Sequence, residues 1–221
     1  MVTRWVGKSC LAFALFAAAP LATGCVDNNA SAFVRQVQAM NTDDCTWPSD
    51  ASATALAWGQ VDPNLRSDYM AALLVGNQLV SRGDPDLLRP ETDRIVFTEV
   101  EVHVFDLAGN ELTSFVVPAT GFADPGTGTS PGYGVVVAPV LDVTALAAGA
   151  GQTVVSEVIV FGKTLGNIDI ETAPYQFSIR IGALGCVQPE QLDDPLKSVC
   201  LLGQDSAPDC RCFDVNGNYT C

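Results

Sequence analysis

The chain has 221 residues, of which 48% are hydrophobic and 16% are charged, with 25 acidic residues against 11 basic ones. This hydrophobic fraction excludes a disordered chain and is sufficient for one large core or two small ones. The net charge of −14 argues against nucleic acid as a partner, because binding to phosphates requires clustered lysine and arginine.

The first 24 residues have the pattern of a signal peptide. Arg4 and Lys8 precede an uncharged run of 13 residues, Cys10 to Ala22. This run is shorter than the roughly 20 apolar residues that a membrane-spanning helix needs. Without these two cations, 9 basic residues stand against 25 acidic ones, and the net charge is −16.

The segment that follows the apolar run, Leu21-Ala22-Thr23-Gly24-Cys25, resembles the lipobox of bacterial lipoproteins. The resemblance implies cleavage before Cys25 and acylation of its sulfur and its new amino group. Several acyl chains make a stable anchor, whereas one chain binds only marginally. Val26 directly after Cys25, where an aspartate would favour the inner membrane, implies sorting to the outer membrane. The alternative is an ordinary secretory signal, with Cys25 as a disulfide partner.

A short polar tether, residues 25–32, leads into a strand-rich body, residues 33–184. Alternation and β-branched content predict strands at residues 33–38, 69–75, 95–105, 112–117, 133–140, 153–161 and 174–181. In 95–105 we expect one buried face formed by Val96, Val100, Val102 and Val104, opposite Glu99, Glu101 and His103.

The connections between these strands carry turn signals. Residues 106–111 predict a hairpin turn, since Gly109 and Asn110 can adopt positive φ. Residues 119–132 predict a long exposed loop, and 142–149 a single helical turn that begins at Asp142. Short strands with almost no helical period predict an all-β fold, an antiparallel two-sheet sandwich of immunoglobulin-like or fibronectin-like shape.

The C-terminal tail, residues 185–221, is rich in cysteine. Apart from Cys10 and Cys25, six cysteines remain as disulfide candidates: Cys45, Cys186, Cys200, Cys210, Cys212 and Cys221. An even number in a secreted chain predicts three disulfides, and Cys45 is expected to tie the N-terminal segment to the tail. A zinc site is the less favoured alternative, because paired C-x₂-C spacings and histidine ligands are missing from the sequence.

Beyond the lipobox, the mature chain resembles a group of uncharacterised bacterial lipoproteins. The likeness lies in Cys25, the strand Tyr69-x-Ala-x-Leu-x-Val-x-Asn77, the Gly-Lys-Thr-x-Gly run at 162–166 and the tail from Cys200 to Cys210 with its Gly-Gln-Asp. The strand is also faintly similar to the sandwich domains of late-embryogenesis-abundant proteins. The lipoprotein resemblance implies no activity.

Catalytic signals are weak. His103 is the only histidine, and its place on the polar face of a strand favours a solvated or cross-strand role. A phosphate-binding loop that ends in Gly162-Lys163-Thr164 would need glycine at position 157, which is Glu157, so we interpret this run as a hairpin connection. Neighbouring acids are frequent by chance in so acidic a chain: Asp43-Asp44, Asp84 and Asp86, and Asp193-Asp194.

Calcium is the one cofactor that the sequence leaves open. Asp214, Asn216 and Asn218 match the opening of an EF-hand loop, but Tyr219 stands where that loop needs glycine. They are therefore weak candidates for an irregular calcium loop. Gly203-Gln204-Asp205 either faces a ligand or shapes a turn, and the turn is favoured.

These observations favour a non-enzymatic, lipid-anchored module of the cell envelope that binds an envelope protein or a glycan, or has a structural role. The first alternative is a hydrolase of envelope or extracellular polymers that uses paired carboxylates. A calcium-dependent adhesion module is a further alternative.

Overall fold

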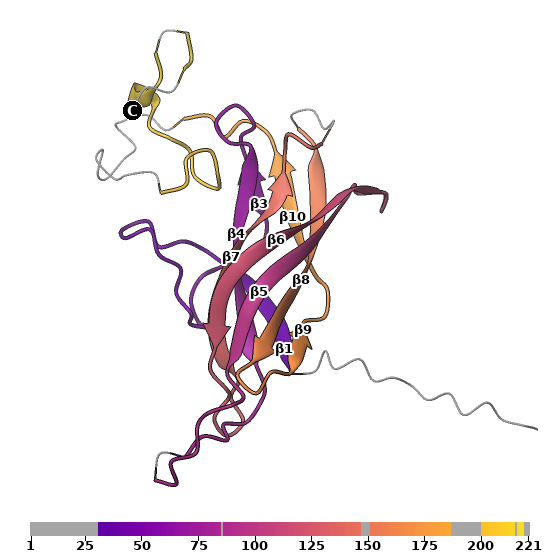
Figure 1. Cartoon of the computed structure of the whole chain (residues 1–221). Coiled ribbons are helices and arrows are strands. Elements are labelled where there is room, and N and C mark those ends of the chain that lie inside the picture. Colours follow the sequence, from indigo (N-terminus) through magenta and orange to yellow (C-terminus); the bar gives the residue numbers. More distant parts are fainter. Residues whose placement is uncertain (1–30, 85, 147–150, 187–199, 215, 219–221) are drawn as a thin grey trace, which may run out of the picture.

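The computed structural model describes residues 31–84, 86–146, 151–186, 200–214 and 216–218 (Figure 1). The predicted signal peptide and Cys25 lie outside the described residues. In the described part of the chain, no helix is long and apolar enough to cross a membrane.

Ten strands form two sheets that pack face to face, as the predicted all-β sandwich requires. They are β1 (Ala32–Gln38), β2 (Ala55–Leu56), β3 (Gly59–Val61), β4 (Asp68–Asn77), β5 (Ile95–Phe105), β6 (Glu111–Ala123), β7 (Gly132–Asp142), β8 (Thr153–Thr164), β9 (Asp169–Glu171) and β10 (Tyr175–Ile181). The only helical segment among the described residues is a short 3₁₀ turn, Cys210–Cys212. The fold prediction is therefore confirmed.

The strand order is that of an immunoglobulin-like sandwich. One sheet has the order β2-β1-β4-β7, and the other has the order β3-β10-β8-β5-β6, with β9 paired to β8. The pairs are antiparallel except β3 with β10, which run parallel. Apart from β2, β3 and β9, the two sheets match strands A-B-E and C′-C-F-G of that architecture.

Alternation along the long strands fills the space between the sheets with one continuous core. In β10, Phe177, Ile179 and Ile181 are buried, whereas Gln176 and Arg180 are exposed. The two sheets also approach closely where β6 ends and β7 begins. A Cβ atom on Gly134 would lie 1.9 Å from the Phe122 carbonyl oxygen, so only glycine fits there.

The expected faces of β5 need one correction. Val100, Val102 and Val104 are buried, but Val96 is 39% exposed. A register shift between Phe97 and Glu99 inserts a β-bulge, which reverses the alternation, so that Ile95 and Phe97 point inward instead.

Other element boundaries also differ from the expectation. The predicted loop 119–132 is wrong over residues 119–123, which continue β6, and the connection is only 124–131. Residues 162–164 belong to β8, and the turn to β9 follows them. Residues 143–146 form a hydrogen-bonded turn directly after Asp142, and residues 147–150 lie outside the described residues.

Candidate functional site

The tail docks on one end of the sandwich through Gln204. Its side-chain Nε2 donates to the Met70 carbonyl at 2.7 Å, and its Oε1 accepts from the Met70 N–H at 2.8 Å. The β1–β4 ladder ends at Leu73, so a side-chain amide takes the place of a neighbouring strand at Met70. Gln204 is only 5% exposed, and its amide supplies partners to the partly buried main-chain groups of Met70.

Asp205 extends this junction to β3. Its N–H donates to the Gln60 carbonyl, and its Oδ1 accepts from the Gln60 N–H at 2.8 Å. Its Oδ2 accepts from the Tyr69 hydroxyl at 2.7 Å. Burial raises the pKa of the Asp205 carboxyl, and burial together with the nearby Asp205 charge raises the pKa of Tyr69. The phenol therefore keeps its proton and acts as the donor.

Gly203 completes the contact, with φ at +78°. A Cβ atom at this position would lie 2.6 Å from the Leu65 Cβ, and the Gly203 carbonyl accepts from the Asp62 N–H. Gly203, Gln204 and Asp205 together form what we call the tail clamp. The clamp holds the tail to β3 and β4 through side-chain contacts, a role that neither the turn nor the ligand interpretation of this tripeptide predicts.

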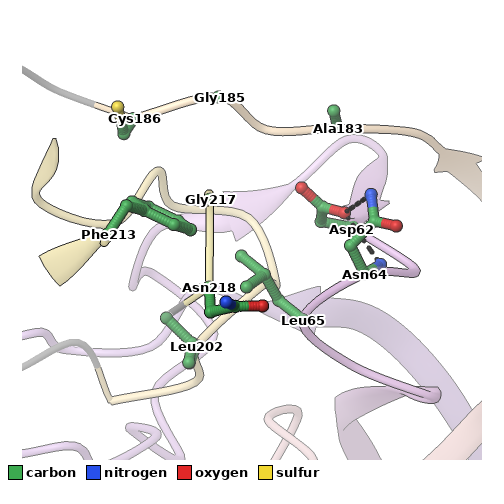
Figure 2. Close-up of a pocket in the computed structure, with 10 residues that line it drawn as sticks. All are labelled: Asp62, Asn64, Leu65, Ala183, Gly185, Cys186, Leu202, Phe213, Gly217 and Asn218. Atoms are coloured by element: carbon green, nitrogen blue, oxygen red, sulfur yellow. Dashed lines mark hydrogen bonds between the residues drawn. The ribbon is translucent and has the colours of Figure 1, made fainter. Parts of the chain in front are cut away.

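A pocket of about 690 Å³ opens beside the tail clamp (Figure 2). Its walls include Asn64 and Leu65 from the body, and Leu202, Phe213 and Asn218 from the tail. Residues from both ends of the chain therefore meet in one pocket.

The buried Asp62 carboxylate fixes the rim of this pocket. Its Oδ1 accepts from the Asn64 backbone and side chain at 3.0 and 3.1 Å, and its Oδ2 accepts from the Leu184 N–H at 3.1 Å. Asn64 and Asn218 each donate through the side-chain nitrogen. Their side-chain oxygens accept no hydrogen bond from the described residues. The pocket thus has two asparagine amides and one carboxylate among its lining residues, beside apolar walls, which suits a ligand with N–H or O–H donors.

Disulfide bonds, which the cysteine count predicts, fasten the tail further. Cys45 pairs with Cys200, which joins the segment between β1 and β2 to the tail. Cys186 pairs with Cys210, next to the pocket. Cys212 is disulfide-bonded as well, and Cys221 lies outside the described residues.

The calcium candidates lie in a turn in which both carboxylate oxygens of Asp214 already accept hydrogen bonds. Asp214 Oδ1 accepts from the N–H groups of Asn216 and Asn218 at 2.8 Å, and its Oδ2 accepts from the Asn218 side chain at 3.0 Å. The β5–β6 turn from Asp106 to Asn110 has the same pattern of bonds. Both segments read Asp-x-x-Gly-Asn, with the glycine at φ of +83° and +85°, so this motif is a hairpin turn here. Within the described residues, no group of three acidic, cysteine or histidine side chains could hold a metal ion.

The other sequence signals also lie in local turns and ladders. His103 contacts Glu111 at 2.9 Å and Glu101 at 3.2 Å on the outer face of β5 and β6. These contacts, above all the hydrogen bond with Glu111, raise the pKa of His103.

The neighbouring acidic residues that the structure describes take part in local hydrogen-bonded turns. Asp44 accepts from the Thr46 backbone and hydroxyl, and Asp84 accepts from the N–H groups of Asp86 and Leu87. The Asp43 N–H donates a hydrogen bond to the Asn41 side-chain oxygen. Asp193 and Asp194 lie outside the described residues. At 162–164, Lys163 forms an ion pair with Asp169 at 2.9 Å in the β8–β9 hairpin.

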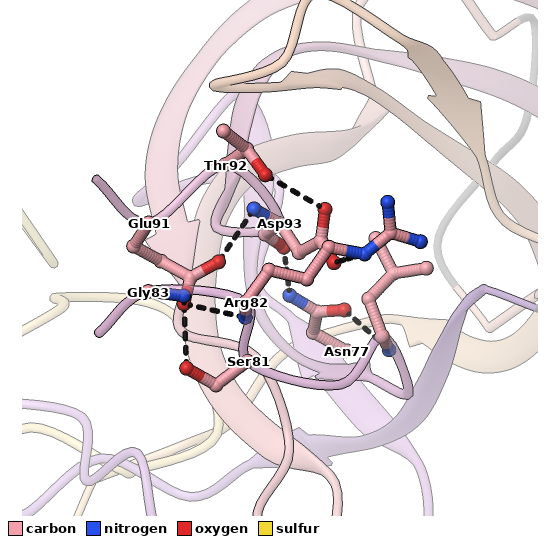
Figure 3. A network of polar contacts seen from close by, with 8 residues as sticks. Asn77, Ser81, Arg82, Gly83, Glu91, Thr92 and Asp93 are labelled. Atoms are coloured by element: carbon pink, nitrogen blue, oxygen red, sulfur yellow. Dashed lines mark hydrogen bonds and ion pairs between the residues drawn. The ribbon is translucent and has the colours of Figure 1, made fainter. Parts of the chain in front are cut away.

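A second polar network closes the opposite end of the sandwich (Figure 3). The fully buried Asn77 donates to the carbonyls of Asp93 and Ala123 and accepts from the Leu79 N–H, which joins the end of β4 to the end of β6 and to the segment before β5. The Glu91 carboxylate accepts from the Ser81 hydroxyl and from the N–H groups of Arg82, Gly83 and Asp93. These bonds, with the Ser81 bond foremost, lower the pKa of Glu91 to about 2.

No protein-family model matches this sequence, and no curated protein matches it. Among solved structures, the solution structure of a late embryogenesis abundant (LEA) protein is similar to this chain, with 14% identity and a TM-score of 0.30. The similarity covers 57% of this chain and 71% of that one. The fold assignment therefore rests on the strand order itself.

Most residues of this site have no signal in the sequence. Met70 and Asp62 belong to no recognisable motif, and Tyr69 stands out only as the start of an apolar strand. The partners of all three lie more than 100 residues away in the chain. The available signals were Gly203-Gln204-Asp205, which stands between two cysteines, and Asn77, a polar residue at the end of an apolar strand.

Proposed function

We propose that this protein is a lipid-anchored module of the cell envelope, held at the outer membrane by acylated Cys25, and that it acts by binding rather than by catalysis. The pattern of residues 1–25 supports the anchor. The disulfides support an oxidising compartment such as the periplasm or the cell surface.

The observation that carries the binding role is the docked tail. The tail clamp and two disulfides fix the tail to the sandwich and build a pocket that neither part has alone. β1 begins at Ala32 beside Asn77, at the other end of the sandwich (Figure 1). An anchored molecule would hold its pocket away from the membrane and toward envelope partners.

The ligand class follows from the pocket lining. The side chains of Asp62, Asn64 and Asn218, beside apolar residues such as Leu65 and Phe213, favour a ligand that donates hydrogen bonds. A glycan or a peptide segment of an envelope protein has these properties.

The anchor is tested by intact mass of the membrane-extracted protein under non-reducing conditions, beside a Cys25→Ala variant. We expect residues 25–221 plus acyl chains, less two hydrogens for each disulfide, and a variant that loses the acyl mass. A soluble, unacylated wild-type product would overturn the anchored role.

The pocket is tested by a photo-crosslinking amino acid at position 64, with position 107 in the β5–β6 turn as the matched exposed control. Cross-links to an envelope component from position 64 but not from 107 are expected. Equal cross-linking from both positions, or release of soluble fragments from isolated envelope polymer by the purified protein, would contradict a binding role for this pocket.

A further inference from the structure

The loop from Gln78 to Arg94 projects from the end of the sandwich at which β1 begins (Figure 1). The Gln78 N–H donates to the Ser31 carbonyl, so the base of the loop lies against the residue that precedes β1. Near its tip, Asp84 and Arg89 form two mutual backbone hydrogen bonds of 2.9 Å. The loop is thus a long arm beside the point where the chain enters the fold.

The tip of this arm presents apolar side chains to solvent. Leu87 is 71% exposed and Leu88 is 90% exposed. Of the eleven large apolar side chains exposed among the described residues, five lie in the loops at this end: Val80, Leu87, Leu88, Leu165 and Ile168. Exposed leucines side by side on a projecting loop are typical of an interaction site.

Leu88 also has an unfavourable backbone conformation. Its φ is +53°, in the left-handed region where glycine or asparagine is the less costly choice. A strained backbone is retained where the residue serves a purpose, and the side chain of Leu88 packs on little of its own protein.

The arm is held in place by polar contacts at its base. The Glu91 carboxylate bridges to Ser81, Arg82 and Gly83 on the opposite side of the loop, and Arg82 forms an ion pair with the buried Asp93 at 3.0 Å (Figure 3). These polar contacts therefore hold the loop that carries Leu87 and Leu88 in a defined position.

The short segment before β1 indicates that a lipid bilayer is what covers this surface. Six residues, 26–31, separate Cys25 from β1, and a fully extended segment of that length spans at most about 20 Å. Each side of the arm, residues 79–84 and 89–94, also has six residues and so a similar maximum reach. An acylated Cys25 would thus keep the tip of the arm within reach of the bilayer.

We infer that Leu87 and Leu88 insert into the lipid surface beside the acyl anchor and orient the sandwich with its tail end away from the membrane. This inference rests on the proposed anchor at Cys25. Burial of two leucine side chains in the acyl region is favourable. The exposed Arg89 near the tip of the same arm is placed to meet lipid phosphates.

The test uses the acylated full chain in vesicles of phosphatidylethanolamine and phosphatidylglycerol with brominated acyl chains, which quench tryptophan inside the bilayer. Leu88→Trp is compared with Leu107→Trp, whose position is 74% exposed at the opposite end, and with the parent chain as the baseline. We expect the added tryptophan at 88 to lose most of its fluorescence and shift to the blue. The tryptophan at position 107 should have the same fluorescence in brominated and in unbrominated vesicles.

Flotation of the same samples separates the two proposals. Protein that floats with the vesicles while position 88 stays unquenched would overturn the inserted loop and leave the anchor intact; a partner protein would then be the occupant. Equal quenching at 88 and 107 would also overturn the inferred orientation. Acylated wild type that fails to float would refute the anchor and the inserted loop together.

Discussion

Gln204 pairs with Met70 through both ends of its side-chain amide, across 134 residues of sequence. The pairing occurs where β4 has a register shift between Tyr69 and Met70 and where the β1 ladder has already ended. A single tail residue therefore completes the sheet edge and fastens the tail, which couples the pocket to the stability of the sandwich.

Replacement of Gln204 by alanine should lower the free energy of unfolding by about 1–3 kcal/mol, because the Met70 N–H and carbonyl lose their partners in a partly buried place. Gln204→Glu should cost more, since a carboxylate oxygen would face the Met70 carbonyl. Denaturant unfolding with the disulfides intact measures both. Gln152→Ala, at an exposed position, is the control, and a loss no larger than the control's would contradict the role of the amide.

Gly203→Ala should be more destabilising than Gly217→Ala, although both residues have φ near +80°. Positive φ alone costs an alanine about 1–2 kcal/mol. At Gly203 the new Cβ also meets Leu65, which adds about 1–3 kcal/mol of overpacking, whereas at Gly217 no atom of the described residues lies within 4 Å of it. Thermal unfolding of both variants measures the difference. Equal losses would mean that the tail can shift away from Leu65 at no cost.

Strand β5 illustrates how far periodicity predicts this fold. Its bounds match the expected 95–105, and the alternation holds from Val100 to Val104. It fails at Val96, because a bulge depends on the neighbouring strands and leaves no mark in a local pattern. The short strands β2, β3 and β9 escaped prediction for a related reason: two or three residues are a strand only through the strand beside them.

The candidate site was less predictable than the fold. The turn from Asp214 to Asn218 matched a calcium motif because Asp and Asn serve turns and cation sites equally well. Only the hydrogen bonds to Asp214 distinguish the two uses. The partners of Gln204 and Asp205 lie on strands from the first third of the chain, and such long-range pairs are invisible to spacing rules.

The Glu91 carboxylate should make the stability of the folded protein depend on pH. Its pKa in the folded state is about 2, below the ordinary value of 4.5, so its contribution is present above pH 4.5 and is lost as the pH falls toward 2. Glu91→Gln should therefore unfold at a lower temperature than wild type at pH 7, and the gap should close over that range. Calorimetry across pH measures the gap. Glu171→Gln, on the exposed face of β9, is the control, and a gap independent of pH would refute the assignment.

His103 offers a direct measurement, because it is the only histidine in the chain. Its hydrogen bond to Glu111, and next that to Glu101, raise its pKa above 6.5. Its contribution to stability is then complete below pH 6.5 and is lost as the pH rises through the raised pKa. NMR titration of the ring should show a lower pKa in Glu111→Gln than in wild type. Glu99→Gln, on the same face, should leave the titration unchanged, and equal shifts in both variants would exclude a specific pair.

Leu88→Asn should stabilise the protein while it weakens contact with lipid. Asparagine tolerates positive φ, so relief of the backbone strain should raise the free energy of unfolding by up to about 1 kcal/mol, or roughly 2–4 °C in Tm. Leu87→Asn removes a similar side chain from a position without positive φ and should bring no gain. Differential scanning calorimetry distinguishes the two variants. If both variants have the same melting temperature, the backbone strain at Leu88 is negligible and gives no reason to assign the residue a function. If Leu88→Asn alone raises the melting temperature and weakens vesicle binding, the strained conformation serves to expose this side chain to lipid.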